Sequence, residues 1–324
     1  SMKPIILHAH ERSITQIKYN REGDLIFSTA KDALPNVWYA INGERLGSFI
    51  GHNGAVWCVD CNWDSTKVMT GAADNSVKIW DLETGKERSS ITTKTAVRTC
   101  AWSYSASEIM YTTDKAMGYP CSLVVCDPRA PTDEEPALKV DVTNSKITAA
   151  VWGPLSRYVV AGHENGELIQ YDTRAGGKVM LVKRAHSDAI NDIQVYKDET
   201  MFVTASKDYY AKLFDIYDLE HIKSYKTERP VNSAAISPLR DHVLLGGGQE
   251  ASQVTTTAVR QGKFDSRFFH LVYEEEVARC KGHFGPINSV AFSPDGRGFS
   301  TGGEDGLVRM HVFDSEYYEY DMEC

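Results

Sequence analysis

A histidine, a threonine, an aspartate and a tryptophan stand at fixed distances within the first hundred residues of this sequence. They are His52, Thr70, Asp74 and Trp80, and Asp74 follows His52 by 22 residues and Thr70 by four, while Trp80 follows Asp74 by six. An imidazole, a hydroxyl and a carboxylate are the groups of a nucleophilic catalytic triad. The same groups could equally be buried hydrogen-bonding partners that hold neighbouring strands together.

The same spacing recurs three more times, and this recurrence decides between the two interpretations. The further sets are His10, Ser28, Asp32 and Trp38; His186, Thr204, Asp208 and Phe214; and His283, Thr301, Asp305 and His311, where an imidazole stands in the position of the aromatic ring. A catalytic site occurs once in a chain, whereas a structural contact can occur in every repeat. We therefore expect these residues to form structural tetrads with no catalytic role.

The segments around each tetrad predict the elements that position it. After His52 the apolar residues of "AVWCVDCNW" alternate, a turn "WDSTK" follows, and two more strands, "KVMTGA" and "SVKIWD", flank the turn that carries Asp74. Such alternation between turn residues is typical of antiparallel strands. Repeats of roughly 40–45 residues that end in Trp-Asp follow the WD40 pattern of β-propeller blades. The sequence therefore predicts an all-β fold, a seven-bladed WD40 β-propeller closed by the N-terminal strand.

The repeats set the blade boundaries within a single domain of residues 1–324. The predicted blades cover about 9–50, 51–91, 92–142, 143–183, 184–226, 227–279, and 280–313 with 3–7. The last unit lacks a fourth strand, while "KPIIL" at 3–7 has no unit of its own. Because pairing the two ends removes the open edges of a ring, we predict that residues 3–7 supply the outer strand of the last blade. We also expect Tyr317 and Tyr318 to pack against this closure.

Composition narrows the classes of function. The chain has 324 residues, a net charge of −9 and seven cysteines. An acidic protein is repelled by phosphate backbones, so sequence-specific nucleic-acid binding is disfavoured. We find neither an apolar run that could span a membrane nor a motif for a cofactor or a metal. Cys58 and Cys61 form an isolated CxxC pair, which we interpret as two small residues of one strand in a reduced, cytoplasmic protein.

Three further segments carry residues that could serve a function. The glycine-rich "GGGQEAS" at 246–252 lacks the lysine and helix of a phosphate-binding loop, so we interpret it as a turn. The insertion at 248–265, which overlaps it, is longer than a hairpin needs, and such long loops are often functional or ordered by packing. The segment 127–139 contains three prolines and several acids, and we expect a surface loop that could contact a partner. His163 has no tetrad around it, and we expect an imidazole at the surface or in a turn.

Several stretches lie outside the general repeat pattern and resemble one family. They include "TDKAMGYPC", "SKITAAVWGPL", "LLGGGQEASQVTTT" and "GKFDSRFFHLVYEEE". Through them the chain resembles the WD-repeat subunit i of eukaryotic translation initiation factor three, from about residue 3 to residue 320. The third unit, with "AWSYSASEIMY" and "DPRAPTDEEPALK", departs most from the family.

This resemblance implies a function without catalysis or cofactor. Such subunits are scaffolds that bind subunits b and g of the factor and support pre-initiation complex assembly and scanning on the small ribosomal subunit. The resemblance implies a monomeric propeller within a hetero-complex, with a C-terminal helix of subunit b docked at the fifth and sixth units. On this basis Leu213 and Asp215 are the candidate partner-binding residues, although Leu213 fits the blade core equally well.

Two other classes of function remain open from the sequence. One is a WD40 adaptor of another complex, in ubiquitin ligation or receptor-kinase signalling. The other is an enzyme built on a propeller, which would need a separate buried polar cluster in the central channel, and the sequence shows none outside the repeats.

Overall fold

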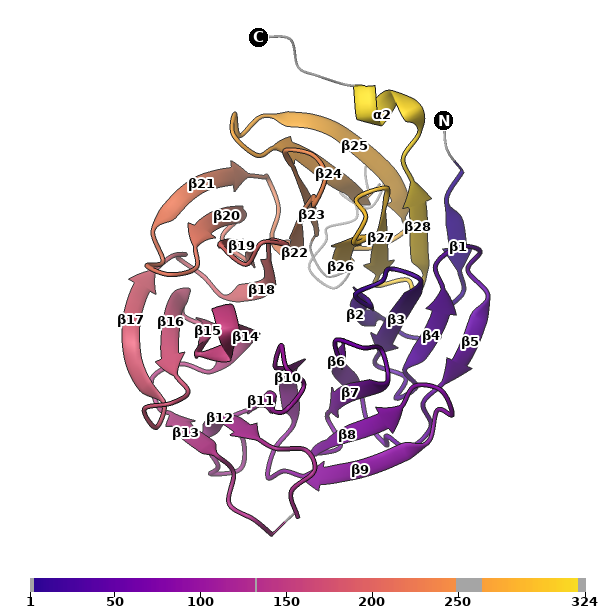
Figure 1. Cartoon of the computed structure of the whole chain (residues 1–324). Coiled ribbons are helices and arrows are strands. Elements are labelled where there is room, and N and C mark those ends of the chain that lie inside the picture. The colour runs from indigo at the N-terminus through magenta and orange to yellow at the C-terminus, as the bar shows by residue number, and fades with distance from the viewer. Residues whose placement is uncertain (1–2, 132, 249–263, 320–324) are drawn as a thin grey trace.

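Seven twisted sheets stand around a central axis in the computed structural model, which describes residues 3–131, 133–248 and 264–319 (Figure 1). Each sheet has four antiparallel strands, and six of the seven use four strands that are consecutive in the chain. The predicted all-β, seven-bladed propeller is therefore confirmed.

The first four blades are built from consecutive strands. Blade 1 contains β2 (Ile14–Tyr19), β3 (Leu25–Ala30), β4 (Asn36–Tyr39) and β5 (Arg45–Ser48). Blade 2 contains β6 (Val56–Cys61), β7 (Lys67–Ala72), β8 (Ser76–Asp81) and β9 (Glu87–Thr92). Blade 3 contains β10 (Val97–Trp102), β11 (Ile109–Thr113), β12 (Cys121–Cys126) and β13 (Leu138–Val142). Blade 4 contains β14 (Ile147–Trp152), β15 (Tyr158–His163), β16 (Glu167–Asp172) and β17 (Lys178–Arg184), with a 3₁₀ turn at Pro154–Ser156.

The remaining blades complete the ring. Blade 5 contains β18 (Ile190–Val195), β19 (Met201–Ser206), β20 (Tyr210–Asp215) and β21 (His221–Lys226). Blade 6 contains β22 (Val231–Ile236), β23 (His242–Gly247), β24 (Phe264–His270) and β25 (Glu276–His283). Blade 7 contains β26 (Ile287–Phe292), β27 (Gly298–Gly303), β28 (Val308–Val312) and β1 (Ile5–Leu7). A short helix, α2 (Ser315–Glu319), follows blade 7.

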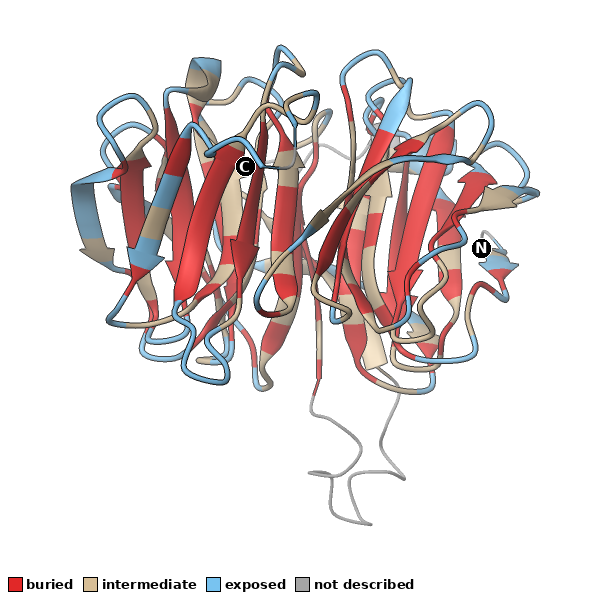
Figure 2. Ribbon diagram, turned by 90° about the horizontal axis from the view of Figure 1, so that it is seen from below, coloured by how far each residue is buried: buried red, intermediate tan, exposed pale blue. Residues whose placement is uncertain are grey.

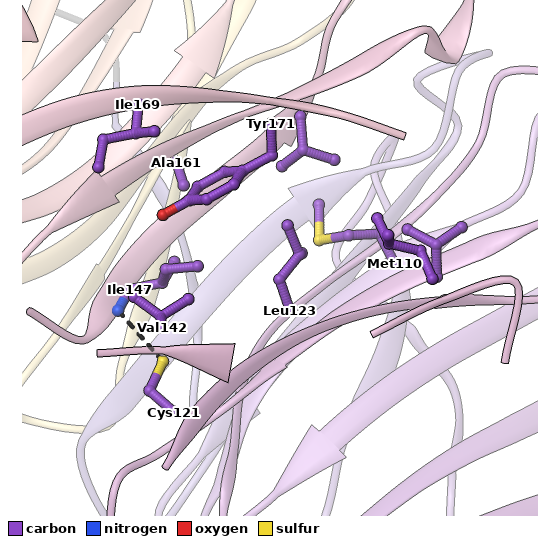
Figure 3. Packing of buried hydrophobic residues seen from close by; sticks show 11 residues of the cluster. Met110, Cys121, Leu123, Val142, Ile147, Ala161, Ile169 and Tyr171 are labelled. Atoms are coloured by element: carbon purple, nitrogen blue, oxygen red, sulfur yellow. Dashed lines mark hydrogen bonds between the residues drawn. The ribbon is translucent and has the colours of Figure 1, made fainter. Parts of the chain in front are cut away.

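Apolar side chains packed between neighbouring blades form the core. Between blades 3 and 4, Met110 and Leu123 meet Ile147, Ala161 and Tyr171, as Figure 3 shows. Figure 2 shows that buried residues follow the strands through the ring, while exposed residues gather in the loops at its two faces. Because burial of apolar surface is the dominant stabilising contribution, each blade depends on both of its neighbours.

Pairing between the two ends of the chain closes the ring. Strand β1 is antiparallel to β28, with Ile5 opposite Met310 and Leu7 opposite Val308. Gly43, in the turn before β5, has φ of 73°, and a Cβ there would lie 2.7 Å from the Leu7 side chain. The predicted closure by the N-terminal segment is confirmed, and blade 1 covers the strand that closes it.

The C-terminal helix packs on the closed ring. The Tyr317 ring stacks on Phe313, with centroids 3.7 Å apart, and its hydroxyl lies 2.9 Å from Nδ1 of His242. Packing of Tyr317 is thus confirmed, whereas the Tyr318 side chain lies outside the described residues. No helix in the described part of the chain is both long enough and apolar enough to cross a membrane.

Two sequence-based loop assignments need correction. Gly246 and Gly247 end strand β23 and do not form a turn, while residues 249–252 and most of the 248–265 insertion lie outside the described residues. The loop after Cys126 ends before Leu138, since Leu138 and Lys139 belong to β13 and Leu138 is buried. In both cases the neighbouring strand extends further than the turn-forming residues indicated.

Candidate functional site

In blade 2 the four residues of the tetrad form one chain of hydrogen bonds. His52 at the entry to the blade lies 2.9 Å from Asp74 through Nδ1 and 2.6 Å from the Thr70 hydroxyl through Nε2. The Trp80 indole N–H donates to the same hydroxyl at 2.8 Å. Since the hydroxyl accepts from Trp80, its own proton is free to be donated to Nε2, and Nδ1–H then donates to Asp74. Every donor in the chain is therefore used.

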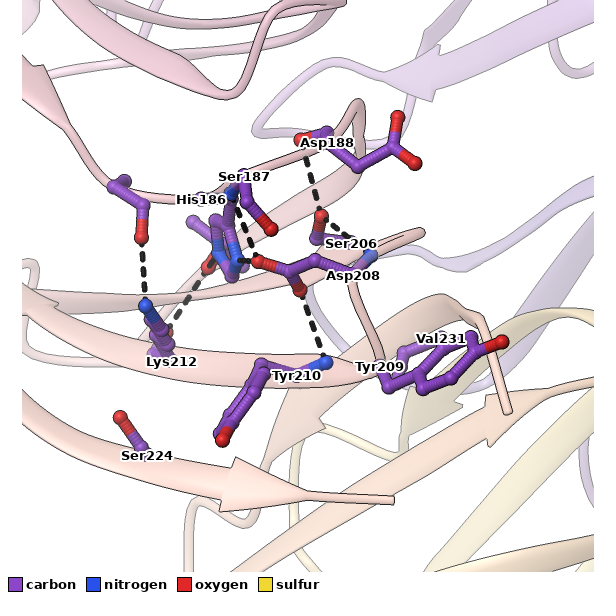
Figure 4. Close-up of polar contacts among 12 residues, drawn as sticks. His186, Ser187, Asp188, Ser206, Asp208, Tyr209, Tyr210, Lys212, Ser224 and Val231 are labelled. Atoms are coloured by element: carbon purple, nitrogen blue, oxygen red, sulfur yellow. Dashed lines mark hydrogen bonds and ion pairs between the residues drawn. The ribbon is translucent and has the colours of Figure 1, made fainter. Parts of the chain in front are cut away.

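Blade 1 repeats this arrangement, and blade 5 repeats it without the last bond. His10 lies 2.8 Å from Asp32, and Ser28 bridges His10 and the Trp38 indole at 2.9 Å each. In blade 5, His186 lies 2.8 Å from Asp208 and 2.6 Å from Thr204, and Asp208 also accepts from the amides of Ser187 and Tyr210 (Figure 4). Phe214 has no donor and only contacts His186 edge-on.

Blade 7 has the first two bonds of the tetrad but a different ring contact. His283 lies 3.1 Å from Asp305 and 2.7 Å from the Thr301 hydroxyl. His311 stacks in parallel on Phe299, with centroids 4.5 Å apart, and its Nδ1 and Nε2 lie 3.7 Å and 4.0 Å from the Cys280 sulfur. No hydrogen bond joins His311 to Thr301 among the described residues, so its imidazole does not replace the indole in the tetrad.

The protonation states in the tetrads follow from burial and from the hydrogen bonds. Burial raises the pKa of Asp74, but hydrogen bonds from Ser76, the Asn53 amide and His52 outweigh it and hold this pKa below its usual range. Burial lowers the pKa of His52, and Asp74 offsets only part of this effect. The pKa values of His186 and Asp208 shift in the same directions. In blades 2 and 5 the pair is thus a neutral imidazole donating to a carboxylate.

This geometry suits fastening better than nucleophilic chemistry. The His52 side chain has no exposed surface, Thr70 is fully buried, and both ring nitrogens of His52 are engaged. A substrate would have to displace an internal partner before reaching the hydroxyl or the imidazole. The tetrad joins the blade entry, two strands and a turn, so its loss would leave buried groups without partners.

His163 shows where the sequence-based interpretation was wrong. It lies in β15 and only 1% of its surface is exposed, so it is neither at the surface nor in a turn. Its Nδ1 lies 2.7 Å from the Ser145 carbonyl oxygen, and its Nε2 lies 3.2 Å from the Tyr171 hydroxyl. Ala161 stands where Thr70 stands in blade 2, and His163 therefore joins the blade entry to the third strand by another route.

A second set of polar contacts, which the sequence analysis did not identify, joins one blade to the next. The first pair of strands in every blade has a register shift after the first residue, so the second residue is extra. Such a bulge redirects a side chain. At five junctions this side chain donates to the carbonyl of the first residue in the next inner strand; the donors are Thr15, Thr148, Asn191, Asn232 and Asn288.

The central channel therefore holds polar groups that the sequence analysis did not expect. Asp192, for example, accepts from the Ser233 hydroxyl at 2.6 Å and from the Gln194 amide at 2.9 Å, and the Ser233 oxygen accepts from the Val290 amide in the next blade at 3.0 Å. These groups are engaged with one another across three blades. In the sequence, the signal for the contacts between blades is the recurrence of Thr or Asn directly after the first apolar residue of a unit.

Of the two candidate partner-binding residues, one is buried in the core and the other lies at the rim. Leu213 is 2% exposed and packs in the core between blades 5 and 6, so its side chain is not available to a partner and that assignment is corrected. Asp215 ends β20 at the rim, where one carboxylate oxygen accepts from the amides of Tyr217 at 2.8 Å and Asp218 at 3.2 Å. Asp215 thus shapes a turn and also places a carboxylate at the rim.

The CxxC pair lacks the surroundings of a metal or redox site. Cys58 is buried, and burial together with Asp60 raises the pKa of the Cys61 thiol to about 12. A thiol with a raised pKa is a poor nucleophile and a poor metal ligand at neutral pH. Across residues 3–131, 133–248 and 264–319, no group of three or more His, Cys, Asp or Glu side chains could hold a metal ion.

Comparisons with known proteins extend over the whole ring. The family model EIF3I matches residues 2–323 of the chain. The protein named "Eukaryotic translation initiation factor 3 subunit I" in Nematostella vectensis is 60% identical over 322 residues, covering 99% of this chain and 100% of the relative. The Homo sapiens protein of the same name is 60% identical over 326 residues, with both chains covered completely. The similarity therefore includes every blade.

Proposed function

Because this chain belongs to the family of subunit I of eukaryotic translation initiation factor 3, we propose that it is a non-catalytic scaffold of that factor. The observation that carries the proposal is the full-length similarity to relatives of that name. The tetrads support a scaffold, since their reactive groups are buried and engaged within the blades. The chain acts in the cytoplasm and binds subunits b and g. Within the assembled factor it supports pre-initiation complex assembly and scanning on the small ribosomal subunit.

The acidic turn after β20 is the site that we propose for subunit b. Asp215, Asp218 and Glu220 lie within six residues of one another, and Tyr217 between them is 58% exposed. Tyrosine with charged groups at a rim is a common composition of protein interfaces. A C-terminal helix of subunit b would place Arg or Lys side chains against the Asp215 carboxylate, and the tyrosine ring would pack against the stems of these side chains.

Substitution of Asp215 tests this site. Asp215→Lys reverses the charge, and we expect at least a tenfold weaker pull-down of subunit b because the basic partner is repelled. Asp215→Asn keeps an oxygen that can accept from the Tyr217 and Asp218 amides, so it should weaken binding less and leave the turn intact. Melting temperatures of both variants, measured beside the pull-down, show whether the blade remains folded.

Asp81 provides a matched control on another blade. It follows Trp80 as Asp215 follows Phe214, and it accepts from the Thr84 amide at 2.9 Å. Asp81→Lys should leave the binding of subunit b unchanged. Equal binding by wild type and Asp215→Lys would remove the proposed site, and recovery of cullin components or membrane kinases in place of initiation-factor subunits would favour the other adaptor functions.

A further inference from the structure

Strand β17 differs from the other outer strands in its exposed apolar residues. Four consecutive side chains are exposed, namely Val179 at 46%, Met180 at 48%, Leu181 at 38% and Val182 at 56%. In blade 2 the corresponding strand reads Glu-Arg-Ser-Ser-Ile-Thr and presents mainly polar groups. Natural proteins usually protect edge strands with charges or cover them, because an open apolar edge is a template for pairing.

The backbone of β17 is open along one side. The strand is the last of its sheet, and among the described residues it pairs with β16 alone, with a bulge at Met180 between Val179 and Leu181. It lies on the outside of the ring (Figure 1). Residues at an edge leave alternate N–H and C=O groups without a partner in the sheet. The strand has seven residues, long enough to pair with an added strand of ordinary length.

Both ends of β17 are held in place, so the open edge is preorganised. Before it, Gly177 has φ of 79°, and a Cβ at this position would overlap the Val140 side chain of β13. After it, Ala185 is buried and its amide donates to the Gly166 carbonyl at 3.2 Å. An added strand would therefore meet an edge that is already extended, which lowers the entropy cost of binding.

The charge around β17 indicates what kind of partner fits. Arg174, Lys178, Lys183 and Arg184 lie in or beside the strand, and no acidic residue occurs from 173 to 187, although the whole chain has a net charge of −9. Asp172 and Glu167 stand opposite Lys178 and Arg184 across the strand pair. Even so, no ion pair within 4 Å involves any of the four cations in the described part of the chain. The edge thus combines free cationic groups with apolar side chains.

We infer that β17 receives an added strand from another protein, an extended segment with alternating apolar side chains and acidic residues at its ends. Main-chain hydrogen bonds would supply much of the affinity, as in other cases of strand addition. A second copy of this chain fits less well, because two antiparallel β17 strands would bring like charges opposite one another. This surface lies on blade 4, beside the proposed Asp215 site of blade 5, whose Tyr217 carbonyl accepts a hydrogen bond from Gln170 of β16. It rests on the proposed function only in that the partner belongs to the same assembly.

Hydrogen exchange in the assembled complex tests the inference. The native factor is purified through this chain, and residue-resolved amide exchange of 178–184 is compared between the isolated chain and the assembly. We expect exchange in the assembly to slow at least tenfold at the amides of β17 that point away from β16, which alternate on each side of the bulge at Met180. Unchanged exchange in an assembly that contains subunit b would overturn the inference while leaving the scaffold function intact. Failure to recover any initiation-factor subunit would instead contradict the scaffold function.

Charge-reversal variants show whether the cations select the partner. Lys178→Glu, Lys183→Glu and Arg184→Glu combined should restore the exchange rate of the isolated chain within the assembly. The matched control combines Arg45→Glu, Lys67→Glu and Lys86→Glu, which change the net charge equally on blades 1 and 2, and protection of β17 should persist. Val182→Ser keeps all charges and removes only an apolar contact, and we expect this loss to reduce the protection of β17 from exchange.

Two other outcomes would each overturn the proposal in a different way. Uniform slowing of all β17 amides would indicate a segment that lies over the strand without pairing with it. A concentration-dependent dimer of the isolated wild-type chain, measured by light scattering and lost in the triple variant, would show that a second copy occupies the edge. We expect the isolated chain to remain monomeric.

Discussion

Blade 2 and blade 7 are both four-stranded antiparallel sheets, but different side-chain contacts hold each of them together. Blade 2 is one continuous segment, and its tetrad runs from Asp74 through His52 and Thr70 to the Trp80 indole. Blade 7 takes its outer strand from the other end of the chain, and its hydrogen-bonded chain stops at Thr301. In place of an indole bond, His311 stacks on Phe299, whose ring also meets Phe268 and Phe313.

This comparison shows that a polar network and aromatic packing can serve at the same position in a blade. The polar network is specific, because each buried donor must meet its acceptor. The aromatic cluster stabilises through buried area and ring contacts and leaves Thr301 with a single side-chain partner. Blade 7 therefore relies more on its closing strand and on its core than blade 2 does.

Removal of the closing strand of blade 7 should cause the largest loss in the free energy of unfolding. Deletion of residues 1–8 removes β1, exposes the edge of β28 and takes the buried Leu7 out of the core. We expect a loss of about 3–5 kcal/mol in the free energy of unfolding, measured by urea denaturation. Ile6→Ala is the control, since Ile6 is 42% exposed and its backbone pairing would remain. A deletion variant as stable as wild type would show that the ring does not need this strand.

The next largest effect that we expect is a loss of stability at low pH, caused by protonation of His311 in blade 7. Burial, with Arg309 and His283 nearby, lowers the pKa of His311 from its ordinary value of 6.5 to about 4. A histidine with a lowered pKa stabilises the fold fully above the unfolded pKa, and this contribution is lost as the pH falls toward the folded pKa. Between pH 7 and pH 5 the loss from His311 is about 2 kcal/mol.

His311→Phe isolates this contribution, because Phe214 occupies the same position in blade 5. Urea denaturation of wild type and variant at pH 7, 6 and 5 should give a flatter profile for the variant. Part of the dependence should remain, since burial also lowers the pKa of His52 and His186, and burial together with His270 lowers the pKa of His242 to about 4. Parallel profiles for the two proteins would mean that His311 is protonated as easily in the fold as in the unfolded chain.

The repeat spacing made the fold predictable, along with the contacts inside each blade. A histidine 22 residues before an aspartate, with a hydroxyl and a ring at fixed distances, recurs because each blade presents the same strands and turn. The N-terminal closure followed from a strand missing in the last unit. These features depend on local spacing and on counting strands, both of which a sequence displays directly.

Features that depend on contacts outside the repeated spacing, within a blade or between blades, could not be predicted in the same way. His163 replaces a tetrad only because Tyr171 and Ser145 lie beside it in the folded blade. Leu213 and Asp215 are two residues apart on one strand, so alternation puts both on the same face, and only packing against blade 6 shows that Leu213 is buried. The exposure of β17 likewise depends on what the adjacent blades leave uncovered.

One matched pair of variants tests the central claim, that the recurring tetrads fasten the blades through linked hydrogen bonds. Thr70→Val leaves both His52 and the Trp80 indole without their partner, whereas Thr301→Val affects only His283, and both threonines are at most 1% exposed. We predict that urea denaturation at pH 7 shows a loss larger by about 1–2 kcal/mol for Thr70→Val. Equal losses, or no loss from either substitution, would contradict the account.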